Sequence, residues 1–156
     1  MHPMRAPIDR QSVIKANAQF WEQMLAMDLE VIPSPLDFSA TAGHLLGSVS
    51  LAGVWKGTID IRMSSGLAYQ ATAAMMMQPL ESVTEADTLD AAKEIANMIA
   101  GTLKSSLPRP CSMTVPESQV AQAEFLGSTA GEDSLEVGFR HLSGLMLIRV
   151  WEQECL

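Results

Sequence analysis

The residues from Thr84 to Leu107 carry the most regular helical pattern in the chain, and they constrain the fold more than any other stretch. An α-helix places successive residues about 100° apart around its axis. On that geometry, apolar residues recur on one side of the segment, at Ala92, Ile95, Ala96, Ile99 and Leu103. A helix with such a stripe docks it on a hydrophobic core. We therefore expect a long helix that packs against the rest of the domain through this side.

The opposite side of the same helix is polar and consists of Asp90, Glu94, Asn97, Gly101 and Lys104. Glu94 and Asn97 are three residues apart, so a carboxylate and a carboxamide lie side by side on the surface. Glycine inside a helix costs about 0.5–1 kcal/mol relative to alanine, and Gly101 is useful here if another backbone must come close. The pattern indicates a flat contact surface with two hydrogen-bonding groups. The alternative is a merely solvated face with a tolerated glycine, which is commoner for an arbitrary helix.

Length and composition restrict the class of protein. A chain of 156 residues suits one domain, and 47% hydrophobic residues supply a sizeable core. The formal net charge of −8 disfavours non-specific nucleic-acid binding, which needs a cationic surface. No run approaches the roughly 20 apolar residues of a membrane span, and residues 1–11 lack the apolar core of a signal peptide. We expect a cytoplasmic protein with no nucleic-acid or membrane partner, a flexible leader at 1–11 and a single domain at 12–156.

Residue types found in common catalytic sites are present without the spacing that those sites need. Cys111 and Cys155 form no CxxC motif and have no nearby histidine, so buried or free thiols are expected rather than a zinc site or a disulfide framework. His2, His44 and His141 fall in a tail, at a strand start and in a turn, outside the context of a nucleophile elbow. These patterns predict no protein-bound metal and give little support to a classical hydrolase.

Two further segments have helical patterns. Residues 11–29 place apolar side chains at helical spacing, with Ser12 as the expected N-cap, and residues 64–77 form a nearly apolar helix capped by Ser64 or Ser65. Three consecutive methionines, 75–77, point to three sides of that helix and therefore cannot share one metal ion. We expect them to fill the core, as methionine often does.

Strand patterns occupy the rest of the chain. Strict alternation predicts strands at 44–51, 54–63, 135–140 and 145–151, with weaker candidates at 112–115 and 119–125. The first two and the last two are expected to form hairpins, because short glycine-containing turns join them. Since the strands cluster instead of alternating singly with helices, the fold class is α+β, with a mainly antiparallel sheet, the long motif-bearing helix and two further helices packed on it.

At this stage the residues carry a resemblance to a known family. Asp90-x-x-x-Glu94-x-x-Asn97, continued by Met98-Ile99-Ala100-Gly101 and ended by Leu107-Pro108, resembles the signature helix of the CheC/CheX/FliY phosphatases of bacterial chemotaxis. The elements at 11–29, 47–61 and 135–150 are similar to the family's first helix, glycine-punctuated strand pair and final hairpin. CheC-like and FliY-like members usually carry two copies of the motif, so the single copy and short length here resemble CheX. Residues 117–122 depart from the family pattern because they lack the glycine that often follows the preceding proline.

The resemblance implies hydrolysis of the aspartyl phosphate on a CheY-type receiver domain. Asn97 would orient the attacking water and Glu94 would bind the receiver's lysine. Asp90 would place Lys93 or touch the rim of the partner, and Gly101 would let the partner approach. The chain would need no cofactor of its own, because Mg²⁺ would come with the receiver. Like CheX, the protein would form a homodimer.

Two other functions remain open on the sequence. A binding module of the same fold would dock a receiver domain or a flagellar-switch component without turning over phosphate. A structural protein would leave the polar helix face solvated, and Glu94→Ala would then change stability by no more than the ~0.5 kcal/mol typical of surface substitutions.

Overall fold

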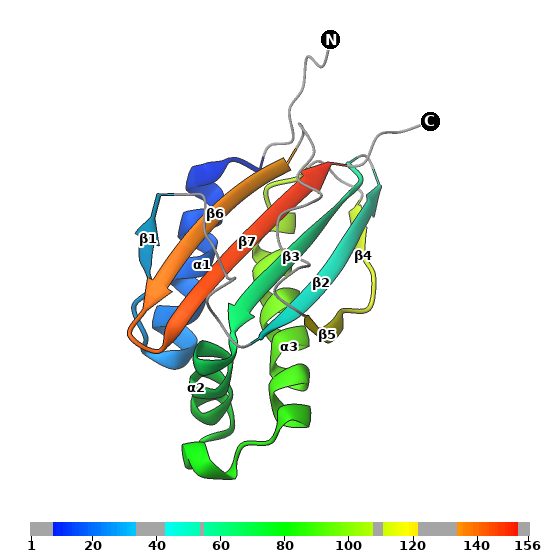
Figure 1. Ribbon diagram of the computed structural model, residues 1–156. Coiled ribbons are helices and arrows are strands. Elements are labelled where there is room, and N and C mark those ends of the chain that lie inside the picture. Colours follow the sequence, from blue (N-terminus) through cyan, green and yellow to red (C-terminus); the bar gives the residue numbers. More distant parts are fainter. Residues whose placement is uncertain (1–7, 34–42, 54, 108–110, 122–133, 153–156) are drawn as a thin grey trace.

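A computed structural model describes residues 8–33, 43–53, 55–107, 111–121 and 134–152 (Figure 1). The helices are α1 (Arg10–Leu25), α2 (Ser65–Met76), the short 3-10 helix η1 (Leu80–Ser82) and α3 (Glu85–Lys104). The strands are β1 (Glu30–Ile32), β2 (His44–Gly53), β3 (Gly57–Ser64), β4 (Cys111–Met113), β5 (Glu117–Ala121), β6 (Ser134–His141) and β7 (Gly144–Glu152).

The strands form one seven-stranded sheet in the order β1-β6-β7-β3-β2-β4, and β5 pairs with β2 beside β4. Every strand pair in the described part of the chain is antiparallel. Figure 1 shows α1 and the upper part of α3 behind the sheet, with α2 and the first turns of α3 projecting below it. The predicted α+β class and both predicted hairpins, β2–β3 and β6–β7, are confirmed.

The first helix begins and ends earlier than its sequence pattern suggested. Ser12 is not the N-cap, so that prediction was wrong. Asp9 caps the helix by accepting from the Ser12 backbone N–H at 2.8 Å, and the Ser12 hydroxyl accepts from the Asp9 backbone N–H at 2.9 Å. The helix ends at Leu25 because Ala26 adopts a left-handed conformation with φ of 54°. The chain after this turn forms β1, a short strand that the sequence analysis missed and that pairs with β6.

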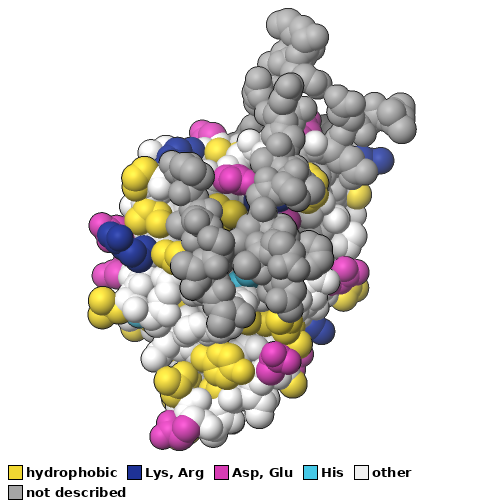
Figure 2. Space-filling model, in the orientation of Figure 1, with side chains coloured by type: hydrophobic (Ala, Val, Ile, Leu, Met, Phe, Trp, Pro, Cys, Tyr) yellow, Lys and Arg dark blue, Asp and Glu magenta, His cyan; other side chains and the backbone are white. Residues whose placement is uncertain are grey.

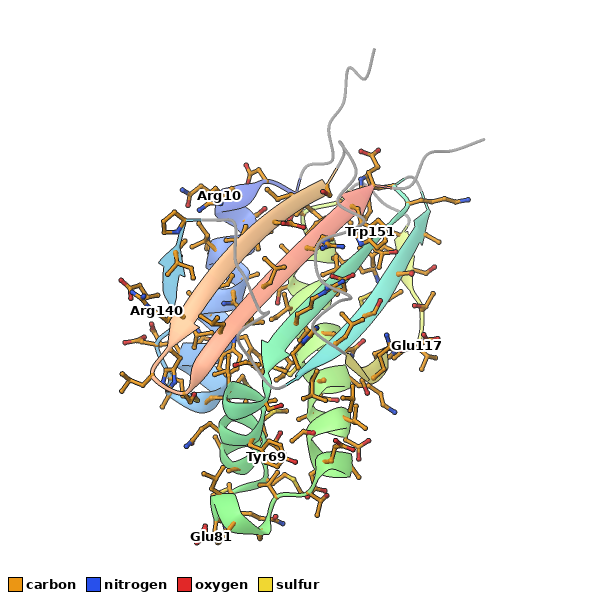
Figure 3. All side chains as sticks on the ribbon, viewed as in Figure 1. Arg10, Tyr69, Glu81, Glu117, Arg140 and Trp151 are labelled. Atoms are coloured by element: carbon orange, nitrogen blue, oxygen red, sulfur yellow. The ribbon has the colours of Figure 1, made fainter. Side chains whose placement is uncertain are left out.

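The methionine run at the end of α2 is not core. Met77 is 91% exposed and Met76 is 41% exposed, so the prediction that the run fills the core was wrong for these two side chains. The reason is the helix end: α2 stops at Met76, and Met77 turns left-handed with φ of 53°. In the orientation of Figure 1, Figure 2 shows hydrophobic side chains over α2 and acidic side chains at the lower tip of the molecule, where Glu81 of η1 lies (Figure 3). Ser64 does occupy the predicted N-cap position of α2, although its hydroxyl accepts from the Leu145 backbone N–H.

The two faces of the sheet differ in character. On the helix side, β3 buries Ile59, Ile61 and Met63 completely, and these join the apolar side of α3 in one core. On the other side, β3 and β7 bury charged residues. Asp60 is 5% exposed, Arg62 6% and Arg149 1%.

The buried charges are arranged across neighbouring strands. Asp60 lies opposite Arg149 in the β3–β7 register, and Arg149 Nε donates to Glu136 Oε2 of β6 at 2.9 Å. Burial raises the pKa of Asp60 above its usual value because it disfavours the charged carboxylate, while the Arg62 and Arg149 guanidinium groups oppose this shift. Because the net shift of the Asp60 pKa is upward, the effect of burial is larger than the opposing effect of the two guanidinium groups.

We expect Asp60→Asn to change how stability depends on pH. A raised pKa means that, as pH rises, the unfolded chain loses the Asp60 proton before the folded protein does. The contribution of Asp60 to the free energy of unfolding is therefore present near pH 4 and is lost as pH rises through the folded pKa. The wild-type free energy of unfolding minus that of Asp60→Asn should therefore fall from pH 4 upward and then level off. Urea unfolding of both proteins at a series of pH values measures this difference. A difference that is constant with pH, or that grows as pH rises, would contradict the assignment.

Several sequence expectations fall outside the described residues. These are residues 1–7 of the leader, the 122–125 end of the weak strand and Cys155. Within the described part, the weak strands predicted at 112–115 and 119–125 appear as β4 and β5 with shifted bounds.

Candidate functional site

The predicted site helix, α3, is anchored at its start and along its apolar side. Thr84 and Asp87 form a reciprocal capping box: the Thr84 hydroxyl accepts from the Asp87 backbone N–H, and the Asp87 carboxylate accepts from the Thr84 backbone N–H. The apolar residues predicted to dock, from Ala92 to Leu103, are all buried. The Ser118 hydroxyl of β5 donates to the Leu89 carbonyl at 2.7 Å and ties the helix to the edge of the sheet. The helix is therefore held in one position over β2.

A glycine in β2 sets how closely α3 approaches the sheet. A Cβ atom added at Gly47 would lie 2.5 Å from the Ala92 carbonyl oxygen and 3.3 Å from the Ala96 Cβ. The strand and the helix backbone meet here at a distance that no side chain allows. The sequence analysis recognised the glycine pattern of this strand pair only through the family resemblance, and the packing reason becomes visible once α3 is placed on β2.

Glu94 and Asn97 lie on the outward side of α3, as predicted. The Glu94 side chain is exposed and Asn97 is partly exposed, and neither side chain forms a hydrogen bond or an ion pair within the described part of the molecule. Both lie well inside the helix, away from its two ends. The pair is thus presented on a regular, packed helix with its hydrogen-bonding groups available to another molecule.

The other two predicted site residues flank this pair. The Asp90 carboxylate lies 4.0 Å from the Lys93 ammonium, a solvent-exposed contact of the kind that contributes little to stability. Gly101 has nothing within 4 Å of the position its Cβ would take, apart from its own helix. Packing within the chain therefore does not require a glycine at position 101, whereas it does require one at Gly47 on the strand beneath α3. The role of Gly101 in a contact surface stays a prediction.

A groove adjoins the polar side of α3, and the sequence analysis did not find it. It has a volume of about 520 Å³ and lies between α3 and the ends of α1 and α2. Its lining comprises Phe20, Gln23, Met24, Leu25, Ala26, Ala74, Met75, Met77, Glu94 and Met98. The available signal was the number of methionines near two helix ends, which the sequence analysis assigned to the core. Glu94 belongs both to this groove and to the polar side of α3.

The described residues contain no group of three or more His, Cys, Asp or Glu side chains placed to hold a metal ion. Among the same residues, no helix combines the length and the apolar character needed to cross a membrane. On α3, Glu94 and Asn97 together offer one exposed carboxylate and one partly exposed carboxamide.

Comparison with known proteins places this geometry in a family. The sequence profile described as "Chemotaxis phosphatase CheX" matches residues 45–139, which include β2, β3, α2 and all of α3. Among curated protein sequences, none matches the chain.

Solved structures share the fold. The chemotaxis protein CheX of Vibrio vulnificus is 18% identical with a TM-score of 0.74, and the match covers 96% of this chain and 100% of that one. CheX of Borrelia burgdorferi, solved as a complex with CheY, BeF3 and Mg²⁺, is 19% identical with a TM-score of 0.73, covering 92% and 97%. FliY of Thermotoga maritima is 12% identical with a TM-score of 0.60, covering 93% and 91%. At these identities the structural likeness establishes the fold alone.

Proposed function

Because the chain belongs to the chemotaxis phosphatase CheX family, we propose that it hydrolyses the aspartyl phosphate of a CheY-type receiver domain through Asn97 and Glu94. One observation carries the proposal. The two side chains stand outward from a rigid helix, and neither has a partner within the described part of its own chain. A polar pair that the fold holds in place and leaves unengaged is suited to enter the site of another protein.

The chemistry needs positioning more than activation. An acyl phosphate is already reactive, so a hydrolase gains most by holding a water molecule in line with the bond that breaks. The Asn97 carboxamide can accept a hydrogen bond from that water through its oxygen and donate one through its nitrogen. Water then attacks phosphorus, the bond between phosphorus and the aspartyl oxygen breaks, the aspartate leaves as a carboxylate, and the proton given up by the water stays on an oxygen of the inorganic phosphate product. In this scheme the carboxamide remains neutral and carries no proton away.

The remaining site residues position the partner. Glu94 pairs with the lysine of the receiver and fixes the angle at which Asn97 enters. Asp90, which contacts Lys93, lies at the rim of the covered surface, and Gly101 leaves room for the partner's backbone. Mg²⁺ is proposed to come with the receiver, and the Borrelia complex of CheX with CheY also contains Mg²⁺. The homodimer and the cytoplasmic location expected from the sequence stay predictions.

The test is a phosphatase assay. Receivers of the CheY type from the genome that encodes this chain are phosphorylated with acetyl phosphate, freed of the donor, and mixed with catalytic amounts of the protein. Accelerated release of inorganic phosphate from at least one receiver is expected. Binding to a receiver with no acceleration for any of them would favour the non-catalytic binding module instead.

Gly101→Ala should stabilise the fold while it weakens binding of the receiver. Alanine is the better helix former and meets open space here, so the free energy of unfolding should rise by about 0.5–1 kcal/mol. The added methyl group stands where the partner's backbone is proposed to approach, so the Kd for a receiver loaded with beryllofluoride and Mg²⁺ should increase severalfold. Urea unfolding and a binding titration measure the two effects. A variant that is more stable and binds as well as wild type would remove Gly101 from the proposed docking surface.

A further inference from the structure

The methionine groove beside Glu94 shares a wall with the proposed docking surface. On α3, Asn97 lies on one flank of Glu94 and Met98 on the other, because residues three and four positions apart fall on either side of the same helical line. Met98 continues into the groove, where Met24 of α1 and Met77, the residue that follows α2, complete an apolar rim. These two side chains are 56% and 91% exposed. Any protein that covers Glu94 therefore comes to lie over the groove as well.

The polar pair alone cannot hold a protein partner. An exposed ion pair such as the one proposed for Glu94 changes affinity by less than about tenfold. One carboxamide that positions water adds little to the binding of the unreacted complex. In protein interfaces most of the affinity comes from a few apolar anchors buried in pockets, with the charged contacts around them setting orientation. The methionine groove is the apolar surface that adjoins Glu94.

We propose that this groove is the affinity-determining half of the docking site, and that it takes an apolar side chain which the receiver presents next to its lysine. This inference rests on the proposed function. The charges support it: among the described residues that line the groove, Glu94 alone is charged, so the complementary partner carries one cation beside an apolar group. Methionine suits such a surface because its flexible side chain adapts to different apolar shapes.

A second copy of this chain fits the groove less well. Two copies related by a twofold axis through the groove would bring two Glu94 carboxylates toward each other, and neither copy offers a cation from the groove lining. Such a dimer would also cover the polar side of α3. The receiver is therefore the occupant that the groove's composition favours.

The test uses the double variant Met24→Gln, Met77→Gln. Glutamine keeps the length and the helix propensity of methionine while it removes the apolar character. The probe is the CheY-type receiver that the wild-type chain dephosphorylates fastest, phosphorylated with acetyl phosphate. KM should rise about tenfold while kcat stays within about twofold. Met76→Gln is the matched control, because Met76 neighbours Met77 and is exposed but does not line the groove. Its KM should stay within about twofold of wild type.

Each outcome decides between alternatives. An unchanged KM in the double variant, with turnover lost in Asn97→Ala, would overturn the groove proposal and leave the catalytic one standing. Full turnover in Asn97→Ala would instead overturn the proposed function. An equal rise in KM for Met76→Gln, which lies outside the groove, would mean that the loss of affinity does not come from the groove and would overturn the groove proposal. A changed oligomeric state in sedimentation, with KM unaltered, would make a second copy the occupant. Urea unfolding of the double variant, of Met76→Gln and of Asn97→Ala checks that each protein remains folded.

Discussion

Asn97→Ala will bind the phosphorylated receiver nearly as well as wild type but will release phosphate about 10²-fold more slowly. The carboxamide is proposed to orient the attacking water, and losing one positioned group at a reacting centre typically costs about two orders of magnitude. The side chain is partly exposed and has no hydrogen-bond partner among the described residues, so its removal should leave the fold intact. Single-turnover phosphate release gives the rate, and titration with the beryllofluoride-loaded receiver gives the Kd.

Two further variants test whether the loss of rate is due to the carboxamide at position 97. Asn97→Asp keeps the shape of the side chain but cannot donate a hydrogen bond, so it should also lose most of the rate. Gln11→Ala removes an exposed carboxamide from the first turn of α1 and should leave the rate unchanged. Equal rates for wild type and Asn97→Ala would exclude the catalytic role. Loss of both binding and rate would mean that Asn97 contributes mainly to docking.

Gly47→Ala will destabilise the protein and reduce turnover together. The added Cβ would lie 2.5 Å from the Ala92 carbonyl oxygen, so either β2 or α3 must move. Overpacking of this kind costs about 1–3 kcal/mol, measurable by urea unfolding. The displaced helix carries Glu94 and Asn97, and a shift of about 1 Å at a reacting group can cost about 10²-fold in rate. The rate should therefore fall even at temperatures where the variant remains folded.

The same substitution elsewhere provides the control. Gly101→Ala lies on the opposite side of α3 and should stabilise the protein, so the two glycine variants are expected to change stability in opposite directions. If Gly47→Ala proved as stable as wild type, the close approach of β2 to α3 would not be what fixes the position of the site helix.

Local patterns were sufficient to predict most of the fold. The alternation of β6 and β7 and the apolar stripe of α3 each arise within one segment, so the class, the hairpins and the outward orientation of Glu94 and Asn97 could be read from the sequence and are found in the structure. The identity of the site residues came from the family resemblance, and their roles stay proposals.

The features that the sequence analysis missed depend on contacts between distant segments. β1 is three residues long and exists because β6 offers it an edge. The end of α2 was predicted to within one residue, but the sequence did not show that Met76 and Met77 would be left exposed there. Asp60 is buried although it lies on the polar side of β3, and alternation alone does not show how deeply a residue on that side is buried. The groove needs the ends of α1 and α2 beside the interior of α3, and no single segment contains that information.

The position of the polar pair in the interior of α3 has a consequence for the energetics of association. Helix ends fray, but residues about two turns or more from either terminus keep their backbone fixed, and the capping box at Thr84 reinforces this. The backbone that carries the two side chains thus loses little conformational entropy when a partner binds. Any larger entropy cost of ordering on binding comes from the partner protein. Discrimination among similar phosphoproteins would then depend on the shape of the surface surrounding the pair.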